Sequence, residues 1–317
     1  MKYTFLLPAY KTDYLRQSIK SILDQTYKDF TIYVSDDCSP YDIKSVVNCF
    51  NDRRIVYNRN KENIGGENLV AHWNKILDYC TSEFVIMASD DDLYSPFFLE
   101  EINNLVIKYP EINIFRSRVQ NIDKDGIVFK KETIYEELST QLEYVSQYYY
   151  TNHIQCIGNY VFKTKAIKEN GGFHYFPLAW YSDFVTTVEL SYNGIVNTNK
   201  ILFSFRLSGK NISSSTRSDK KISKLKLKAV LEYDLWINDF FIKLNKTSLN
   251  KLDTNTLLFI ESEHRDDFIG NVLHYAHIIS IKEIFNFIVK YRSYFKTKIS
   301  LFLFLKKWFY KRYKLNK

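Results

Sequence analysis

Short apolar segments alternate with amphipathic ones between residues 3 and 88, and this alternation limits the possible folds more than any other feature. Four apolar segments have the length and β-branched content of buried strands: 3–7, 30–34, 54–57 and 84–88. Three intervening segments carry apolar residues at helical spacing: 13–25, 42–50 and 67–80. Strands that alternate with helices in this way form a parallel sheet with right-handed crossovers. The sequence therefore predicts an α/β fold with a mostly parallel sheet flanked by helices.

Acidic residues directly follow two of the predicted strands. Asp36 and Asp37 follow the second strand, and Asp90, Asp91 and Asp92 follow the fourth. Ligands of parallel sheets bind beyond the carboxyl ends of the strands, so both clusters are expected at a ligand-binding edge. Three adjacent carboxylates repel one another, and Mg²⁺ or Mn²⁺ would neutralise them. Taken alone, the triplet is explained equally well as an acidic turn that caps the next helix.

Composition limits the class of protein. The chain has 317 residues, 45% of them hydrophobic, which is enough for a large core and more than one compact unit. Its four cysteines form no Cys-x-x-Cys pair, so free thiols in a reducing compartment are expected, without a zinc site. The N-terminus enters a strand at once, which predicts no signal peptide. The longest uninterrupted apolar run, 301–305, is too short to span a bilayer.

The net charge of +8 is concentrated at the C-terminus. No acidic residue follows Glu283, whereas ten basic residues do, and the rest of the chain has a net charge of −2. This distribution argues against a nucleic-acid-binding core and for a tail that meets an anionic surface.

The C-terminal pattern is helical, with helices predicted at 225–243, 254–266, 269–279, 281–291 and from about 295. The last segment mixes apolar and aromatic residues with lysines, which suits a helix lying on an anionic membrane. Packing of the same residues on the protein, with solvated lysines, is the alternative. His264, His274 and His277 are expected to be structural rather than metal ligands.

Five motifs stand in order along the first hundred residues: 5–10 (Phe-Leu-Leu-Pro-Ala-Tyr), 15–27, 35–39 (Ser-Asp-Asp-Cys-Ser), 63–65 (Asn-Ile-Gly) and 89–92 (Ser-Asp-Asp-Asp). Their order and spacing resemble the N-terminal half of a family 2 glycosyltransferase with the Rossmann-like GT-A fold. The resemblance continues less sharply to about residue 215. It implies a GT-A domain at 1–215, with a nucleotide-binding half at 1–94 and an acceptor half at 95–215. A basic, aromatic-rich helical region at 216–317 follows.

The resemblance also implies donor-site roles. Asp37 resembles the family's uracil-contacting acid, and a carboxylate there accepts from N3–H of uracil or thymine, which favours a UDP- or dTDP-sugar. Pro8, Ala9 and Tyr10 resemble the base-binding edge. Asp36 is expected to form the turn.

Further donor and metal contacts are implied by the later motifs. Asn63 and Gly65 match the loop that opens the third helix, although an ordinary loop would look the same. By the match to the family's Asp-x-Asp motif, Asp90 lies near the ribose, Asp91 is the metal ligand, and Asp92 supports the metal or its waters.

Three positions depart from the family pattern. Cys38 stands where the family usually has glycine, and cysteine is expected to fit there only with a negative φ. The family's Arg-Asn pair has no arginine counterpart in 70–74, and Ser208 stands where the family often has histidine.

The acceptor half is expected to supply the base. Asp183 matches the family's general base at the start of a helix, where the helix N-terminus favours an ionised carboxylate; simple capping is the alternative. Trp180 and Tyr181 would offer flat faces to the acceptor sugar. Arg206 opens a loop, 206–213, that resembles the family's donor-site flap, and it is expected to reach the diphosphate; an ordinary polar linker into the C-terminal region explains the loop equally well. His153 is expected to be structural.

Together these features predict an inverting, metal-dependent glycosyltransferase that uses Mn²⁺ or Mg²⁺. Asp183 would take the proton from an acceptor hydroxyl as that hydroxyl attacks the anomeric carbon. The basic tail and the absent signal peptide fit a cytoplasmic enzyme, peripheral at the inner membrane face, acting on a lipid-linked glycan in surface polysaccharide synthesis. A non-catalytic sugar-nucleotide- or membrane-binding module is the main alternative. A nucleotidyltransferase is disfavoured because no Gly-rich basic loop follows the first strand.

Overall fold

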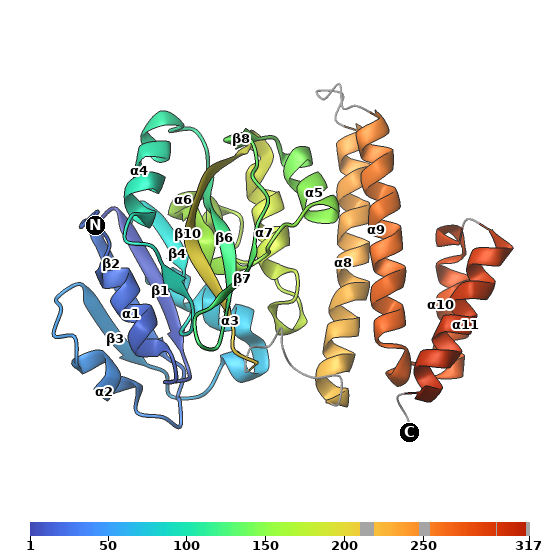
Figure 1. Ribbon diagram of the computed structural model, residues 1–317, viewed down its shortest axis with the longest axis horizontal. Helices are drawn as coiled ribbons and strands as arrows, with labels where there is room; N and C mark the ends of the chain where they lie inside the picture. Colours follow the sequence, from blue (N-terminus) through green and yellow to red (C-terminus); the bar gives the residue numbers. More distant parts are fainter. Residues whose placement is uncertain (210–218, 247–253, 296, 315–317) are drawn as a thin grey trace. The chain divides into compact units, whose positions relative to one another are not determined.

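A computed structural model describes residues 1–209, 219–246, 254–295 and 297–314 of the chain (Figure 1). The chain divides into two compact units. The first comprises Met1–Tyr175 and Tyr181–Ser214, and the second comprises Phe176–Trp180 and Ser215–Lys317. Each unit is described by itself.

The first unit is built on one mixed sheet whose strand order is β3-β2-β1-β4-β9-β6-β10-β5, with β7 beside β6 and β8 beside β10. Its first half holds four parallel strands: β1 (Tyr3–Ala9), β2 (Phe30–Asp36), β3 (Ile55–Arg59) and β4 (Phe84–Met87). They are joined by the helices α1 (Leu15–Leu23), α2 (Ile43–Asn48) and α3 (Gly65–Asp78). The alternation predicted for residues 3–88 is confirmed.

The second half of the sheet includes antiparallel pairs. It contains β5 (Leu93–Tyr94), β6 (Ile114–Asp123), β7 (Val128–Lys131), β8 (Leu138–Ser139), β9 (Tyr160–Lys163) and β10 (Ile195–Leu207). Strand β9 runs antiparallel to both β4 and β6, whereas β10 runs parallel to β6. The helices of this half are α4 (Phe98–Lys108), α5 (Gln141–Tyr150), α6 (Thr164–Glu169) and α7 (Ser182–Leu190).

Strand β10 was not anticipated from the sequence. Its polar residues 197–200 interrupt the apolar pattern, and its pairing with β6 shifts register between Thr198 and Phe203. The strand continues through Arg206 to Leu207, so the expected loop 206–213 begins inside the sheet. Residues 210–213 of that loop lie outside the described residues.

Aromatic packing anchors the segment that follows the aspartate triplet. The Tyr94 ring lies 5.1 Å from Phe5 and 4.9 Å from Phe203, centroid to centroid, and its hydroxyl donates to the Gly158 carbonyl at 2.8 Å. A Cβ atom at Gly158 would lie 2.4 Å from the Phe203 ring, so only glycine fits there. Tyr94 stands two residues after Asp92, and its burial therefore fixes where the triplet emerges from the core.

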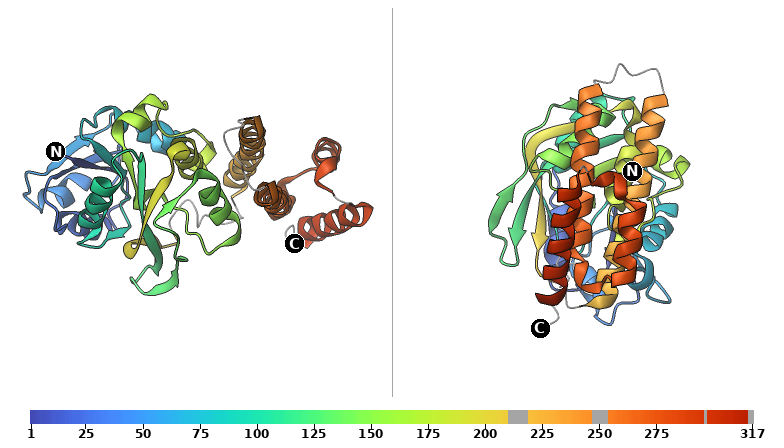
Figure 2. Two further views of the ribbon diagram at one scale, coloured as in Figure 1. Left: turned by 90° about the horizontal axis from the view of Figure 1, so that it is seen from above. Right: turned by 90° about the vertical axis from the view of Figure 1, so that its right-hand side faces the viewer.

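The second unit is helical, as predicted, with α8 (Lys220–Lys246), α9 (Thr254–His274), α10 (Ile281–Lys290) and α11 (Lys298–Lys314). Helices α8 and α9 lie side by side (Figure 2). The predicted separate helix at 269–279 is wrong, because α9 continues without a break past Gly270, where a Cβ would meet nothing within 4 Å. In the part of the chain that the structure describes, no helix is both long and apolar enough to cross a membrane.

The backbone of Cys38 corrects one expectation. Its φ is +52°, in the left-handed region, although a negative φ was expected. The turn after β2 requires this conformation: Asp37 N–H donates to the Ala9 carbonyl at 3.0 Å, and Ser39 N–H donates to Asp36 Oδ1 at 2.9 Å. A left-handed non-glycine residue costs roughly 1–2 kcal/mol. The turn therefore stores strain at a position where glycine would have none.

Replacing Cys38 with glycine should stabilise the protein by about 0.5–1 kcal/mol, because the relieved strain exceeds the extra chain entropy of glycine. Urea denaturation measures the change. Cys49→Gly is the matched control: Cys49 ends α2 with a φ of −61°, so glycine there relieves nothing and should destabilise. Equal destabilisation by the two substitutions would contradict the strain at Cys38.

Candidate active site

The acidic residues of the triplet lie at the carboxyl edge of β4, and Asp90 ties this edge to β1. Its Oδ2 accepts hydrogen bonds from the backbone N–H groups of Tyr10 at 3.0 Å and Lys11 at 2.9 Å. Burial and the neighbouring Asp91 raise the pKa of Asp90 to about 6, against these two bonds. The structure thus brings the expected base-binding edge, Pro8 to Tyr10, into contact with the triplet.

The other two carboxylates of the triplet have different surroundings. Asp92 is buried, and its Oδ1 accepts from the backbone N–H of Arg206 at 2.8 Å. Burial, followed by the charge of Asp91, holds the pKa of Asp92 well above its usual range. Asp91 Oδ1 accepts from the Ser89 hydroxyl. The mutual repulsion of these carboxylates is a charge deficit that a cation would relieve.

The residues fit a metal that is held weakly by the protein alone. Across residues 1–209 and the other described ranges, no three His, Cys, Asp or Glu side chains converge as a preformed metal site. Backbone amides engage Asp90 and Asp92, whereas Asp91 accepts from the Ser89 hydroxyl; the expectation that Asp91 is the ligand, with Asp92 in support, fits this arrangement. One carboxylate supplemented by waters and substrate phosphates is the usual environment of Mg²⁺.

The Arg206 side chain binds the main chain of the triplet at the Asp91 carbonyl. Its guanidinium is buried: Nε donates to the Asp91 carbonyl at 2.8 Å, and Nη2 donates to Gln17 Oε1 at 3.0 Å. Nη1 lies 3.3 Å from the carbonyls of Asp123 and Lys124. Because β10 carries this side chain under the loop, its donors face protein acceptors. This arrangement corrects the expected role: these contacts of the buried guanidinium are to protein acceptors, so Arg206 positions the triplet rather than the diphosphate.

Asp37 joins the end of β2 to the start of α3. Its Oδ1 accepts from Asn60 Nδ2 at 2.8 Å and Ile64 N at 3.0 Å, and its Oδ2 accepts from Gly65 N at 2.7 Å. The Asp37 carboxylate is buried. Tyr10, at the end of the neighbouring strand β1, is 40% exposed. Asp36 accepts from Tyr57 and Arg59 at 2.6 and 2.5 Å, and it forms the turn as expected.

Two residues around Asp37 have roles that the sequence motifs did not show. Asn63 Oδ1 accepts from Gly66 N at 2.6 Å, so Asn63 caps the loop that enters α3. His72 is buried with Nδ1 3.6 Å from Asp37 Oδ2 and Nε2 2.8 Å from the Ser35 hydroxyl. Burial lowers the pKa of His72, which keeps it neutral. The sequence places His72 among the apolar residues on one face of α3, and this position could have predicted its burial.

Gly65 allows the close approach between α3 and Asp37. A Cβ atom there would lie 2.9 Å from Asp37 Oδ2. Gly65→Ala should therefore displace the carboxylate from its backbone donors and destabilise the protein by about 1–3 kcal/mol, the usual effect of unsatisfying a buried acceptor. Chemical denaturation measures it. Gly270→Ala, in the open interior of α9, is the control and should stabilise by up to about 1 kcal/mol. Similar changes in the free energy of unfolding for the two variants would contradict the close contact between Gly65 and Asp37.

Asp183 lies in the first turn of α7. Its Oδ1 accepts from the backbone N–H of Phe184 at 2.8 Å. Burial raises the pKa of Asp183 to about 6, opposed by the Phe184 amide and the Gln155 side chain. The preceding residues Leu178, Ala179 and Tyr181 all have positive φ, so the entry into α7 is strained. Of the two expected acceptor-binding residues, Tyr181 belongs to the first unit and Trp180 to the second, where Lys226 Nζ lies 4.4 Å above its ring.

The Cys156 thiol connects Asp183 with the triplet. Burial raises the pKa of Cys156 well above its usual range, and the charges of Asp92 and Asp183 raise it further. Both carboxylates therefore lie within electrostatic reach of one buried side chain. All four cysteines are free thiols.

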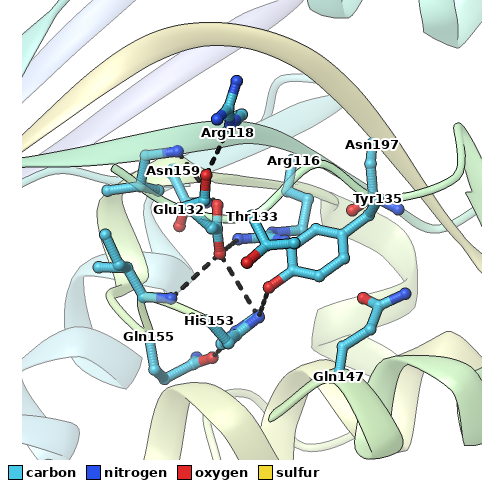
Figure 3. A network of polar contacts seen from close by, with 12 residues as sticks. Arg116, Arg118, Glu132, Thr133, Tyr135, Gln147, His153, Gln155, Asn159 and Asn197 are labelled. Carbon is cyan, nitrogen blue, oxygen red and sulfur yellow. Dashed lines mark hydrogen bonds and ion pairs between the residues drawn. The ribbon is translucent and has the colours of Figure 1, made fainter. Parts of the chain in front are cut away.

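A buried polar network around Glu132 and His153, which reaches Gln155, was not expected from the sequence (Figure 3). Arg116 Nη2 donates to Glu132 Oε1 at 2.6 Å, and Glu132 also accepts from the backbone N–H groups of Val119 and Ile154. His153 is buried beside Glu132. It is structural, as expected, but it is part of a continuous chain of contacts that leads to Gln155. No local pattern in the sequence marks these residues.

The parallel half-sheet with an acidic triplet at its carboxyl edge, continued by a mixed half-sheet, is the arrangement of the GT-A fold. The glycosyl transferase family 2 model matches residues 4–171, and the chain belongs to this family.

Several known proteins are similar to parts of the chain. An uncharacterised glycosyltransferase of Methanocaldococcus jannaschii is 25% identical over 159 residues, which cover 49% of this chain and 53% of that protein. The GalNAc(5)-diNAcBac-PP-undecaprenol beta-1,3-glucosyltransferase of Campylobacter jejuni is 39% identical over 94 residues, 29% of this chain and 30% of that protein. The matches thus span about half or less of these curated relatives.

Solved structures share the fold over most of the chain. TarS 1–349 of S. aureus in complex with UDP-GlcNAc has a TM-score of 0.58 at 18% identity, covering 88% of this chain and 84% of that one. The mannosyltransferase PcManGT of Pyrobaculum calidifontis in complex with GDP-Man and Mn²⁺ has a TM-score of 0.56 at 12% identity, covering 98% and 86%.

Proposed function

We propose that this protein is an inverting, metal-dependent glycosyltransferase that moves a sugar from a UDP- or dTDP-sugar to a hydroxyl of a glycan acceptor. The observation that carries the proposal is the match to glycosyl transferase family 2 over residues 4–171, together with an acidic triplet whose Asp90 is bonded to the backbone of the Pro8–Tyr10 edge. The charges of both Asp183 and Asp92 raise the pKa of Cys156, which supports a base close to the triplet. The position of Asp37 beside the Pro8–Tyr10 edge supports a uracil or thymine base. The TarS complex with UDP-GlcNAc supports the same donor class.

The mechanism follows from what the carboxylates do. The Asp183 carboxylate takes the proton of the acceptor hydroxyl as its oxygen bonds to the anomeric carbon. The bond from that carbon to the donor phosphate oxygen breaks, and its electron pair leaves with the nucleoside diphosphate. A divalent metal held by Asp91, with Asp92 in support, would neutralise the leaving diphosphate. Asp90 and Arg206 hold the triplet in place, and no covalent enzyme intermediate is needed.

Donor binding across a panel of nucleotide sugars, with and without Mn²⁺, tests the proposal. A UDP- or dTDP-sugar should bind with metal, and Asp91→Ala should weaken binding roughly tenfold or more, because a charged contact to the metal is lost. Asp183→Asn should bind the donor normally but transfer about 10²–10⁴-fold more slowly. Asp125→Ala, in the exposed β6–β7 turn, is the control. Binding of no donor, or binding indifferent to metal and Asp91, would favour a non-catalytic module.

We further propose that the acceptor is lipid-linked and that the second unit contacts the cytoplasmic membrane face, with surface polysaccharide synthesis as the setting. Helix α10 exposes Ile281, Phe285 and Val289, which are spaced four residues apart on one face. Helix α11 exposes Phe302 and Leu303 beside its lysines, although it buries Phe304 and Trp308. An apolar face flanked by lysines suits an anionic lipid surface. The lipid-linked substrate in the name of the Campylobacter relative supports the acceptor class.

Vesicle co-sedimentation tests the membrane contact. The protein should bind phosphatidylglycerol vesicles more than phosphatidylcholine vesicles, and less at high salt, because screening weakens the attraction. The triple substitution Ile281→Ser, Phe285→Ser and Val289→Ser should reduce binding by about tenfold or more. Ile107→Ser with Tyr192→Ser, equally exposed positions in the first unit, is the control. Unchanged binding by the triple variant would contradict this face as the contact.

A further inference from the structure

The carboxamide of Gln155 has opposite surroundings at its two ends. Its Oε1 faces three donors: His153 Nε2 at 2.9 Å, the Tyr160 hydroxyl at 3.1 Å and the Tyr144 hydroxyl at 3.2 Å. Its Nε2 is buried and, among the residues that the structure describes, makes no hydrogen bond of ordinary geometry, although the side chain lies close enough to Asp183 to favour the ionised carboxylate. When the proton of His153 lies on Nε2 and a tyrosine hydroxyl donates, the oxygen side of the amide is satisfied and its N–H groups face the other way.

The donors that hold Gln155 are themselves fixed. Burial keeps the pKa of His153 well below its usual range, so its ring is neutral. In the tautomer with a proton on Nε2 the ring donates to Gln155, while Nδ1 lies 3.4 Å from both the Tyr135 hydroxyl and Glu132 Oε1. Tyr144 and Tyr160 hydroxyls are 2.8 Å apart. Figure 3 shows the part of this support that runs from Gln155 through His153 and Glu132 to Arg116.

The free end of the amide lies on the side of Asp183. The Tyr144 ring stacks on Phe184, the residue after Asp183, with centroids 5.6 Å apart. The charge of Asp183 raises the pKa of Tyr144, whose hydroxyl contacts Gln155, and the pKa of Cys156, the next residue in the chain. The Gln155 side chain in turn favours the ionised form of Asp183. A buried donor without a well-formed hydrogen bond lowers the stability of the fold, and a bond to the neighbouring carboxylate during function would account for its presence.

We propose that Gln155 is a positioning residue for the Asp183 base: its amide N–H donates to the carboxylate when the acceptor is bound. Catalytic hydrogen bonds that are long in free enzymes often shorten in the reacting complex. With Phe184 N–H on Oδ1 and the Gln155 amide as a second donor, the carboxylate cannot rotate, and it keeps lone pairs for the acceptor hydroxyl. This inference rests on the proposed role of Asp183 as the base.

The pH dependence of kcat/KM for sugar transfer tests the inference. In the wild type the rate should rise through about pH 6, because only ionised Asp183 accepts the proton and its pKa is about 6. Gln155→Met removes the donor that favours the ionised form. It should move the rising limb upward by about 0.5–1 pH unit and lower kcat about 10–100-fold, with the donor KM unchanged. Gln155→Glu keeps the shape of the side chain but places a second negative charge beside Asp183. The rising limb of its pH profile should therefore move to still higher pH.

The controls separate this inference from the proposed function. Gln147→Met removes another glutamine of the same region, whose amide donates to Ser139 at 3.1 Å, and it should keep the wild-type limb. If Gln155→Met and Gln155→Glu both keep the wild-type limb and kcat while Asp183→Asn is inactive, Gln155 has no positioning role. An active Asp183→Asn would instead show that Asp183 is not the base. If Gln155→Met fails to fold, the limb of Gln155→Glu decides alone.

Discussion

Buried carboxylates held by backbone amides are the interaction on which this structure depends. At the carboxyl edge of the sheet, Asp37 accepts from the first amides of α3, Asp90 from the chain after β1, and Asp92 from β10. Each of these bonds offsets part of the desolvation of a charge. Each also joins two elements that are remote in sequence. The acids of the edge are therefore structural connections as well as chemical groups.

The amide bonds do not fully compensate the charge of the triplet. Asp90 and Asp92 keep raised pKa values because burial and the neighbouring Asp91 outweigh their donors. An edge that is organised but still under-compensated is suited to receive a cation together with the oxygens of a nucleotide diphosphate. Arg206 contributes by holding the main chain of the loop at the Asp91 carbonyl, which fixes the backbone that carries the proposed metal ligand.

The acceptor side is organised by a different kind of support. Asp183 rests on the first turn of α7, and the Arg116–Glu132–His153 network reaches Gln155, whose side chain favours the ionised carboxylate. A buried ion pair of this sort contributes little net stability, but losing one partner leaves an uncompensated charge and is strongly destabilising. The network is thus better understood as a means of fixing orientation. It connects the conformation of a short segment, 153–156, to the strand β6.

The sequence alone determined the alternating strands and helices, the acidic clusters at one sheet edge, the family, and the helical character of the C-terminal region. Those features follow from periodicity and from the order of short motifs, which are local. Tertiary structure alone decided the long strand β10, the left-handed Cys38, the role of Arg206 and the network around Glu132 and His153. The physical reason is separation along the chain: Arg206 bonds the Asp91 carbonyl across 115 residues, and no local pattern records such a contact. Where a residue's partner is distant, its type is visible in the sequence, but its role is set by the fold.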